Sequence, residues 1–495
     1  MNLRLMLEAS AKQYGTKTAV VMGERRLSYI QLDEMANKVA NALLGMGVKK
    51  GDRVAMLLTN SPEFVAFYFG VVKIGGIAVP LDTRYKLGEL TSLFDNSKPK
   101  VVVSESPILE PIVKASSRFG YIKHIIDVRG KEIMSAPSAL RSEVALKPQD
   151  IAHIAYTSGP TLRPRGVVLS HESLVREAAI SAAGFRQTDR DVVALFALPM
   201  HHAFGLVVVM MTAIFKGSTV VMVPGLSIDN LLEVIEREKV TIFMGVPFIY
   251  LLLVDKVEAE GMKHDLSSLR LCGSAGAAMP GGVLRRFQQL FKRDAVDFWG
   301  MTESSAHVTC QSLDGVGKPG SVGKALAGWE LKIVDGNGRE LPPNQPGEII
   351  VRGPVMKGYY KSPEATARAI RNGWLYTGDV GRLDEASNLF LTGMSKDMII
   401  VKGQNIYPGD IEAVLSTHPK VAEVAVVGIP DEIRGETVRV VVRLKPGSVA
   451  DEAELKHFCR EHMADFKVPR QIVFVNSLPK TADGKVDKKS LRRAG

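Results

Sequence analysis

The most constraining feature of this sequence is the alternation of short apolar runs with amphipathic segments along its first two thirds. Apolar runs typical of buried strands occur at residues 54–58, 77–80, 101–103, 192–198, 220–223 and 241–244. Residues 62–73 have a helical pattern, and Ser28 with Gln31 forms a capping box before a helical repeat that ends at Gly45. This order predicts an α/β fold with mainly parallel sheets, in which phosphate-bearing ligands bind at the carboxyl ends of strands.

The chain is too long for one hydrophobic core, because it has 495 residues and single cores stop growing at about 250–300. From about Trp329 the sequence pattern changes. It predicts short strands, at 330–334 and 348–351, separated by Gly and Pro turns. From about residue 395 the order strand, helix, strand, strand, helix, strand predicts an α+β unit. We therefore expect a large N-terminal domain (1–394) with a β-rich subdomain at about 329–393, and a small C-terminal domain (395–495).

The composition is that of a globular protein, with 46% hydrophobic and 23% charged residues. Cys272, Cys310 and Cys459 lie too far apart for a disulfide scaffold or a cysteine zinc site, which favours a reducing compartment. The net charge of +10 comes from scattered Lys and Arg, with a basic run only at the C-terminal tail. We interpret the excess as suited to small anionic substrates, and we predict no nucleic-acid partner.

The sequence contains no segment expected to cross a membrane or direct export. The most apolar stretch, residues 204–223, is interrupted by Lys216, Gly217 and Ser218, whereas a spanning helix needs about 20 apolar residues. The first 15 residues lack the apolar core and cleavage site of a secretory signal. We therefore expect a cytoplasmic protein, with peripheral contact to a membrane left open. Nothing in the sequence specifies its oligomeric state.

Residues 156–171 contain a loop with the groups that cradle a polyphosphate. The loop follows the strand-like run 151–155 and precedes a helix-like segment. Its amides, hydroxyls and guanidinium groups can donate to phosphate oxygens. The residues concerned are Thr157, Ser158, Gly159, Thr161, Arg163, Arg165 and Gly166. Taken alone, such a loop is more often a solvated turn than a phosphate site.

Two other patterns carry less weight. The string 315–320 matches GxGxxG, but it contains Pro319 and leads toward a strand, so we interpret it as chance. The adjacent His201 and His202 would point to opposite faces of an extended segment, and no third metal ligand is near them in the sequence. One of them lining a pocket is the better interpretation.

Read together, these features resemble the adenylate-forming superfamily of acyl-CoA synthetases, luciferases and peptide-synthetase adenylation domains. The resemblance covers nearly the whole chain, through motifs in the family's order. They are the phosphate loop at 156–166, Pro199-Met-His-His202, Gly245-Val-Pro247, Gly276-Ala277-Ala278, Trp299-Gly-Met-Thr302-Glu303, Tyr376-Thr-Gly-Asp379 and Pro479-Lys-Thr-Ala-Asp-Gly-Lys485.

The resemblance implies an ATP-dependent acyl-CoA synthetase. A carboxylate attacks the α-phosphate of Mg-ATP to form acyl-AMP and pyrophosphate, and the thiol of CoA then displaces AMP. The implied nucleotide-binding residues are Thr157, Ser158, Gly159, Thr161, Arg165, Gly276, Ala277, Ala278, Trp299, which stacks on adenine, and Asp379, which binds the ribose.

The same resemblance assigns the chemical steps. Glu303 binds Mg²⁺, and Thr302 and Lys485 act on the reacting phosphate. The C-terminal domain rotates about a hinge near Lys396, so that Lys485 serves the first half-reaction and the turn containing Gly403 receives the pantetheine arm of CoA. His202 gates the thiol channel.

The sequence departs from the family's pattern at several positions that contact ATP. Pro160, Leu162 and Arg165 replace the usual Ser or Thr, Gly and Lys of the phosphate loop, Met394 replaces an arginine, and Trp299 replaces a tyrosine. Three hypotheses therefore stay open: an active acyl-CoA synthetase, an adenylating enzyme that passes its acyl group to a carrier protein or another acceptor, and a binding or regulatory homologue with an impaired ATP site. Apolar residues at 204–211, with Val246 and Phe248, favour a medium or long-chain fatty acid, with an aromatic acid next. Such runs are more often core than pocket lining.

Overall fold

The protein is described here by a computed structural model. It describes the chain except residues 106–108, 129, 131–132, 134, 141, 143, 158–164, 277–278, 280, 315–316, 395–398, 407, 480–485 and 494–495. Its contacts divide the chain into two compact units. The large unit comprises Met1–Thr83, Ser97–Ala155 and Gly166–Gly393, and the small unit comprises Arg84–Asn96, Tyr156–Arg165 and Met394–Gly495.

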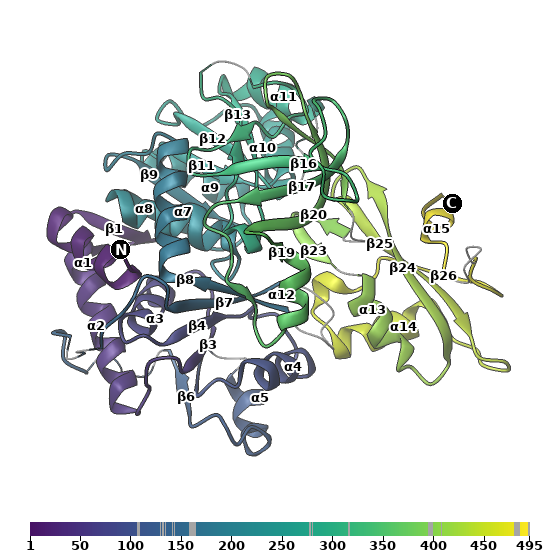
Figure 1. The fold of residues 1–495 in the computed structure, drawn as a ribbon, viewed down its shortest axis with the longest axis horizontal. Coiled ribbons are helices and arrows are strands. Elements are labelled where there is room, and N and C mark those ends of the chain that lie inside the picture. Colours follow the sequence, from purple (N-terminus) through teal and green to yellow (C-terminus); the bar gives the residue numbers. More distant parts are fainter. Residues whose placement is uncertain are drawn as a thin grey trace. The chain divides into compact units, whose positions relative to one another are not determined.

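The large unit contains a sheet of nine strands (Figure 1). Its strands run parallel from β13 to β1, and antiparallel strands close both edges. In spatial order they are β15 (Lys324–Ala325), β14 (Thr309–Cys310), β13 (Ala295–Trp299), β12 (Leu271–Ser274), β11 (Ile242–Gly245), β9 (Val192–Phe196), β10 (Thr219–Val223), β1 (Thr18–Met22) and β2 (Arg25–Ser28).

A second sheet has seven strands, with β4, β3, β5 and β6 in parallel register. At its edge, β18 pairs antiparallel with β8. In spatial order the strands are β18 (Gly358–Tyr359), β8 (Arg165–Ser170), β7 (Ile151–Thr157), β4 (Ile77–Pro80), β3 (Arg53–Leu57), β5 (Val101–Ser104) and β6 (His124–Asp127).

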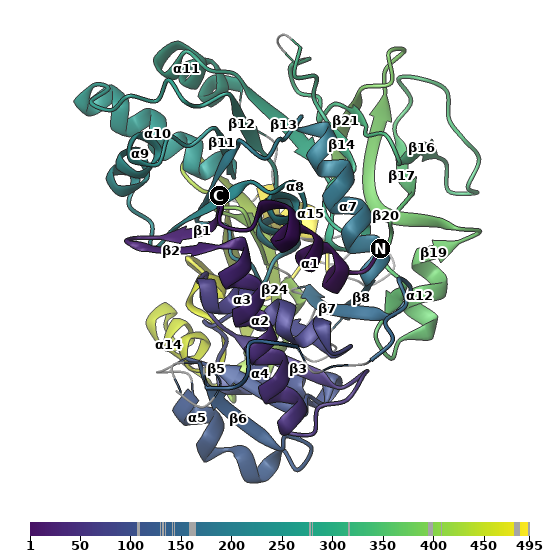
Figure 2. The same ribbon diagram turned by 90° about the vertical axis from the view of Figure 1, so that its left-hand side faces the viewer.

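Helices fill the space between these two sheets (Figure 2). The central one, α3 (Pro62–Lys73), contacts β4 of one sheet and β1 of the other, and all its residues except Glu63 are buried. It also packs on α2 (Tyr29–Gly45), where a Cβ at Gly70 would lie only 2.6 Å from Val39, so this close approach requires glycine. α1 (Leu3–Tyr14) packs on both helices.

The chain before the C-terminal residues contains further helices and 3-10 or π segments. They are α4 (Leu87–Ser97), α5 (Leu109–Lys114), η1 (Ser116–Arg118), α7 (His171–Gly184), η2 (Phe204–Met211), α8 (Thr212–Lys216), α9 (Ile228–Arg237), α10 (Pro247–Glu260), α11 (Gly281–Phe291), η3 (Thr302–Ser304) and α12 (Pro363–Ala369). No helix among the described residues is long and apolar enough to cross a membrane.

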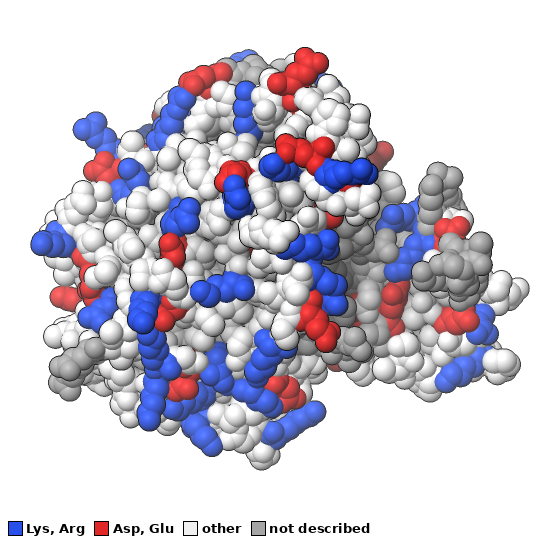
Figure 3. Space-filling model, in the orientation of Figure 1, with Lys and Arg blue, Asp and Glu red and all other residues white. Residues whose placement is uncertain are grey.

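The β-rich part of the large unit is an antiparallel sheet, with β21 beside β20. Its strands are β16 (Glu330–Val334), β17 (Gly347–Arg352), β20 (Trp374–Leu383), β19 (Ile370–Arg371) and β21 (Leu389–Met394). On the face of the protein in Figure 3, Lys and Arg lie among Asp and Glu, in keeping with the scattered charge of the sequence.

In the small unit, one sheet buries apolar residues on both faces. α13 (Pro408–Ser416) packs on β24, α14 (Glu452–His462) packs on α13 and β26, and α15 (Lys488–Arg493) packs on β24. η4 (Asp465–Lys467) follows α14. The strands are β23 (Gln404–Ile406), β22 (Ile399–Val401), β25 (Gly435–Leu444), β24 (Val421–Asp431) and β26 (Gln471–Phe474).

The α/β fold expected from the sequence is confirmed, and so is the capping box at the start of α2, where Ser28 and Gln31 bond to each other's backbone amides. The helix expected after the segment 156–171 is also confirmed, because α7 begins at His171. The strand β8 within that segment was not predicted. Since Val167, Val168 and Leu169 are buried and two of them are β-branched, this run forms a strand beside β7.

Candidate functional site

Two of the residues expected to bind the nucleotide meet in the large unit. Trp299 ends β13, and its indole Nε1 donates a hydrogen bond to Asp379 Oδ2 on β20 at 3.1 Å. Trp299 is 7% exposed, whereas Asp379 is partly exposed. The sequence anticipated both residues but not this hydrogen bond between them.

A local irregularity of the sheet sets the direction of Asp379. The register of β17 against β20 shifts between Glu348 and Ile350, and Gly378 has φ of +77°. The Gly378 amide donates to Glu348 Oε1 at 3.1 Å, and the Thr377 hydroxyl donates to the carbonyl of Ile349 at 2.7 Å. Bulges of this kind redirect side chains next to functional sites, and glycine adopts the positive φ without strain.

Thr302 and Glu303 lie in the short helix η3, directly after β13. The loop around them is tightly folded, because a Cβ at Gly300 would lie 1.8 Å from the carbonyl oxygen of Ala306. Ser305 and Ala306 adopt positive φ values of 59° and 117° although neither is glycine. Backbone strain of this kind concentrates at functional sites.

Glu303 is buried, at 7% exposure, and its carboxylate accepts a hydrogen bond from Tyr359 Oη at 2.9 Å. Its carbonyl oxygen accepts from the Met356 amide at 2.8 Å. Among the residues that the structure describes, no Lys or Arg forms an ion pair with Glu303. Tyr359 belongs to no motif singled out in the sequence, and only its place in the fold identifies it.

A buried polar network supports the far end of this loop. His307 Nδ1 lies 3.0 Å from Ser181 Oγ, and Glu177 accepts from Ser181 at 3.2 Å and from Trp329 Nε1 at 3.1 Å. Burial raises the pKa of Glu177 well above its usual value and lowers the pKa of His307 to about 3. The imidazole is therefore neutral at physiological pH, and it stacks on Phe185 with ring centres 4.5 Å apart.

The two adjacent histidines do not point to opposite faces, as an extended segment would require. They lie in a turn, and their ring centres are 4.3 Å apart. His201 Nε2 lies 3.4 Å from Asp82 Oδ2, whereas His202 is exposed. Asn60 holds the same turn through the carbonyl of Leu198 and the amide of Met200.

The apolar residues that favoured a fatty acid divide into two groups. Those at 206–211 are all at most 3% exposed and, with Val246 at 7%, belong to the core of the large unit. Phe204 and Phe248 are half-buried, and the Phe204 ring meets Phe298 edge-on at 5.2 Å. The side chains of this second group are the more accessible ones.

Several expected site residues lie outside the described part of the chain: Ser158, Gly159, Thr161, Ala277, Ala278, Lys485 and the hinge residue Lys396. Thr157 ends β7, Arg165 is exposed at the start of β8, and Gly276 is exposed after β12 with φ of +84°. Of the departures from the family pattern, Pro160 and Leu162 are also outside it, and Met394 ends β21.

Gly403 lies in the turn between β22 and β23 of the small unit, with φ of +79°. This conformation favours glycine whatever the ligand. The turn therefore supplies a conformational reason for Gly403, in addition to the space for CoA that the sequence suggested.

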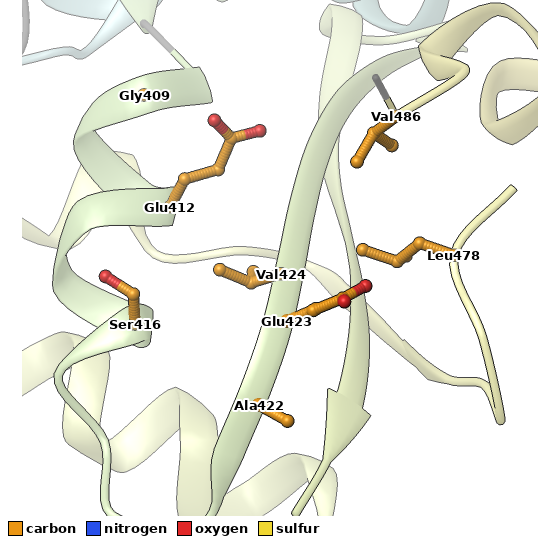
Figure 4. Close-up of a pocket in the computed structure, with 8 residues that line it drawn as sticks. All are labelled: Gly409, Glu412, Ser416, Ala422, Glu423, Val424, Leu478 and Val486. Carbon is orange, nitrogen blue, oxygen red and sulfur yellow. The ribbon is translucent and has the colours of Figure 1, made fainter. Parts of the chain in front are cut away.

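The small unit also has a groove of about 400 Å³ that contains no expected site residue (Figure 4). Glu412 extends from α13 into the space between this helix and β24, and it pairs with Lys488 at 2.9 Å. The lining residues are Gly409, Glu412, Ser416, Ala422, Glu423, Val424, Leu478 and Val486. Among the described residues no group of three or more His, Cys, Asp or Glu could hold a metal ion.

Two family models match this chain. Residues 7–360 match the AMP-binding enzyme family, and residues 410–485 match the AMP-binding enzyme C-terminal domain. The chain is 32% identical to a long-chain-fatty-acid–CoA ligase of Bacillus subtilis, over 99% of this chain and 94% of that protein.

Two further relatives have different named substrates or products. A CoA ligase of Mycobacterium tuberculosis, whose named acyl group is a methyl-dioxo-octahydroindenyl propanoyl group, is 34% identical over 99% of this chain and 98% of that protein. The structure of an amide bond synthetase from Marinactinospora thermotolerans matches with a TM-score of 0.90 and 28% identity, over 100% of this chain and 99% of that one.

The chain therefore belongs to the AMP-binding enzyme family, within the adenylate-forming superfamily. Its class is that of the AMP-forming acid–CoA ligases.

Proposed function

We propose that this enzyme activates an apolar carboxylic acid, a medium or long-chain fatty acid, in two half-reactions. In the first, a carboxylate oxygen of the acid bonds to the α-phosphorus of ATP and pyrophosphate leaves. In the second, the thiolate of CoA attacks the acyl carbon and AMP leaves with the bonding electron pair. The hydrogen bond between Trp299 and Asp379 is the observation that carries the proposal, because it joins two nucleotide-binding motifs that are 80 residues apart.

The nucleotide would be held through its base and its ribose. The indole of Trp299 offers a large face for stacking on adenine. The carboxylate of Asp379 has two acceptor oxygens for the ribose hydroxyls, and the Trp299 hydrogen bond restrains its orientation. Gly276, Ala277 and Ala278 would lie along the base.

The site of Glu303 fits a Mg²⁺ ion bound together with ATP. Its buried carboxylate is hydrogen-bonded by a neutral phenol and forms no ion pair with the described cations, so its charge matches a cation supplied with the substrate. When bound, Mg²⁺ would offset the charge of the phosphates. Glu303 would hold the ion, and Thr302 would donate to a phosphate oxygen.

The remaining site residues are expected to act at the phosphates and at CoA. The β- and γ-phosphates would be cradled by Thr157, Ser158, Gly159, Thr161 and Arg165. The ammonium of Lys485 would offset charge that develops at the α-phosphate. His202, exposed in its turn, would gate the thiol channel, and the turn at Gly403 would receive the pantetheine arm.

Two observations support a fatty acid. The half-buried Phe204 and Phe248 are apolar, and the Bacillus subtilis relative is named for long-chain fatty acids. The ring-bearing acyl group of the Mycobacterium tuberculosis relative makes a bulky cyclic acid the alternative substrate. The similarity to an amide bond synthetase supports a second candidate, an adenylating enzyme whose acyl acceptor is an amine.

Release of pyrophosphate and AMP across a panel of acids distinguishes these functions. With fatty acids, sustained AMP release should require ATP, Mg²⁺ and CoA together. AMP release with amines but not with CoA would support the second candidate. ATP binding without turnover of any aliphatic, aromatic or cyclic acid would instead indicate the regulatory homologue.

Two variants test the ATP-dependent half-reaction separately: Lys485→Ala and a chain with a restored phosphate loop. Lys485→Ala should slow acyl-adenylate formation by about a hundredfold or more, because water replaces a positioned ammonium poorly. It should leave thioester formation from a supplied acyl-adenylate unchanged. Replacing Pro160, Leu162 and Arg165 by Thr, Gly and Lys should tighten ATP binding if these residues weaken the loop.

A further inference from the structure

The hydroxyl that holds Glu303 comes from a segment outside every recognised motif. Tyr359 lies in β18, and its side chain reaches the carboxylate from the edge of the seven-stranded sheet. Both residues are buried, Tyr359 at 8% and Glu303 at 7% exposure. A buried hydrogen bond to a charged group is stronger than one at the surface, so this contact can determine the orientation of the carboxylate.

We propose that Tyr359 is a positioning residue for Glu303, which orients the carboxylate that would hold Mg²⁺. This inference rests on the proposed function. The phenol donates to Oε1 at 2.9 Å, which restrains rotation of the carboxylate. Mg²⁺ requires near-octahedral geometry and uses one or two carboxylates together with phosphate oxygens, so a carboxylate held in one orientation suits it.

The chemical type of the group that contacts Glu303 matters as much as its position. A Lys or Arg at the same place would neutralise Glu303 within the chain and compete with the metal ion for it. A phenol donates a hydrogen bond and adds no positive charge. Tyr359 can therefore orient Glu303 without reducing its charge, in the way that outer-shell hydrogen bonds orient metal ligands.

The segment 354–360 also ties Glu303 to the strand that follows the expected phosphate loop. The amides of Lys357 and Tyr360 donate to the carbonyls of Val168 and Gly166, at 2.8 and 2.7 Å. The Met356 amide donates to the carbonyl of Glu303 at 2.8 Å. One short segment thus sets the distance between the start of β8 and the metal-binding carboxylate.

Two further contacts restrain the segment itself. The Tyr359 amide donates to Thr366 Oγ1 of α12 at 2.8 Å, and Ser305 Oγ donates to the carbonyl of Pro354 at 2.7 Å. The backbone position of Tyr359 therefore does not depend on its own hydroxyl. Removal of that hydroxyl should leave the segment in place.

Tyr359→Phe tests the inference, with Tyr360→Phe as the matched control. Tyr360 is the neighbouring tyrosine and makes no hydrogen bond to Glu303 among the described contacts. Binding of Mn²⁺ in the presence of a non-hydrolysable ATP analogue, followed by electron paramagnetic resonance, reports the metal site without turnover. Tyr359→Phe should weaken Mn²⁺ binding by about tenfold, the lower end of outer-shell effects.

The Mg²⁺ concentration for half-maximal acyl-adenylate formation should rise by a similar factor in Tyr359→Phe. Thioester formation from supplied acyl-adenylate, and all properties of Tyr360→Phe, should match the wild type. Unchanged Mn²⁺ affinity in Tyr359→Phe, with or without a lower melting temperature, would overturn the inference. A wild type that forms no acyl-adenylate would overturn the proposed function instead, and the Mn²⁺ titration would still decide the role of Tyr359.

Discussion

Lys73 and Glu303 are both buried charged residues of the large unit, but in the described part of the chain only Lys73 has a countercharge. Lys73 is fully buried in α3, and its Nζ lies 2.6 Å from Asp33 Oδ1 and 2.6 Å from Asn37 Oδ1. Among the residues that the structure describes, Glu303 receives only the neutral hydroxyl of Tyr359 at its carboxylate. A buried charge paired within the chain serves the fold, whereas one left without a countercharge costs stability and suits a ligand.

Glu303→Gln should give the largest effect on function. Gln keeps the shape and can still accept the Tyr359 hydrogen bond, but it loses the charge that binds the metal. Acyl-adenylate formation should fall by at least about a hundredfold, which corresponds to about 3 kcal/mol. The free energy of unfolding should stay equal or rise, because a buried charge is removed. A large loss of stability would break the contrast with Lys73.

Lys73→Met should have the opposite profile. Met has a similar length but cannot neutralise Asp33, so the free energy of unfolding should fall by about 3 kcal/mol. The folded fraction should form acyl-adenylate at the normal rate. Urea denaturation measures the loss, with Lys100→Met as control. Lys100 pairs with Asp52 at 2.9 Å with both side chains 27% exposed, so its loss should cost under about 1 kcal/mol.

A half-buried carboxyl group, that of Asp297 on β13, allows a test by pH. Burial raises the pKa of Asp297 to about 7. The unfolded chain releases this proton from about pH 4 upward, whereas the folded chain keeps it until about pH 7. The stability contributed by this group is therefore lost as pH rises, by about 2 kcal/mol between pH 5 and pH 7. Asp297→Asn should remove that part of the pH dependence in urea titrations at several pH values.

Trp299→Phe should give the smallest effect. Phe can stack on adenine but cannot donate to Asp379, so ATP binding should weaken by about 1 kcal/mol, or fivefold. The preference for ATP over 2′,3′-dideoxy-ATP should shrink in competition binding, because the carboxylate is less well oriented for the ribose. The control is Trp374→Phe, because Trp374 lies on β20, the strand that carries Asp379. An unchanged preference in Trp299→Phe would show that Asp379 needs no such support.

Much of the fold could be predicted because its signals are local. The strand at residues 77–80 and the helix at 62–73 appear with the expected bounds, since apolar runs and helical periodicity depend on neighbouring residues. β8 was missed because it follows the phosphate-loop segment directly, and only pairing with the rest of the sheet distinguishes it from the start of a helix.

The candidate site was only partly predictable. Trp299, Glu303 and Asp379 stand in recognisable motifs, but the hydrogen bond of Trp299 to Asp379 joins residues far apart in the chain. Tyr359 and the positive φ values of Ser305 and Ala306 have no local signature. At position 403, the positive φ of the turn gives a conformational reason for glycine that the motif had not suggested.

By itself, the sequence of this protein determined which chemistry its residues can perform and many of the segments that become helices and strands, because side-chain type and periodicity are properties of short stretches. Only the tertiary structure decided which buried charge is neutralised. Lys73 meets Asp33 because α3 packs on α2, and Glu303 meets a phenol because β18 pairs with β8. Both depend on contacts between distant segments, and the energy of a buried charge is set by those neighbours.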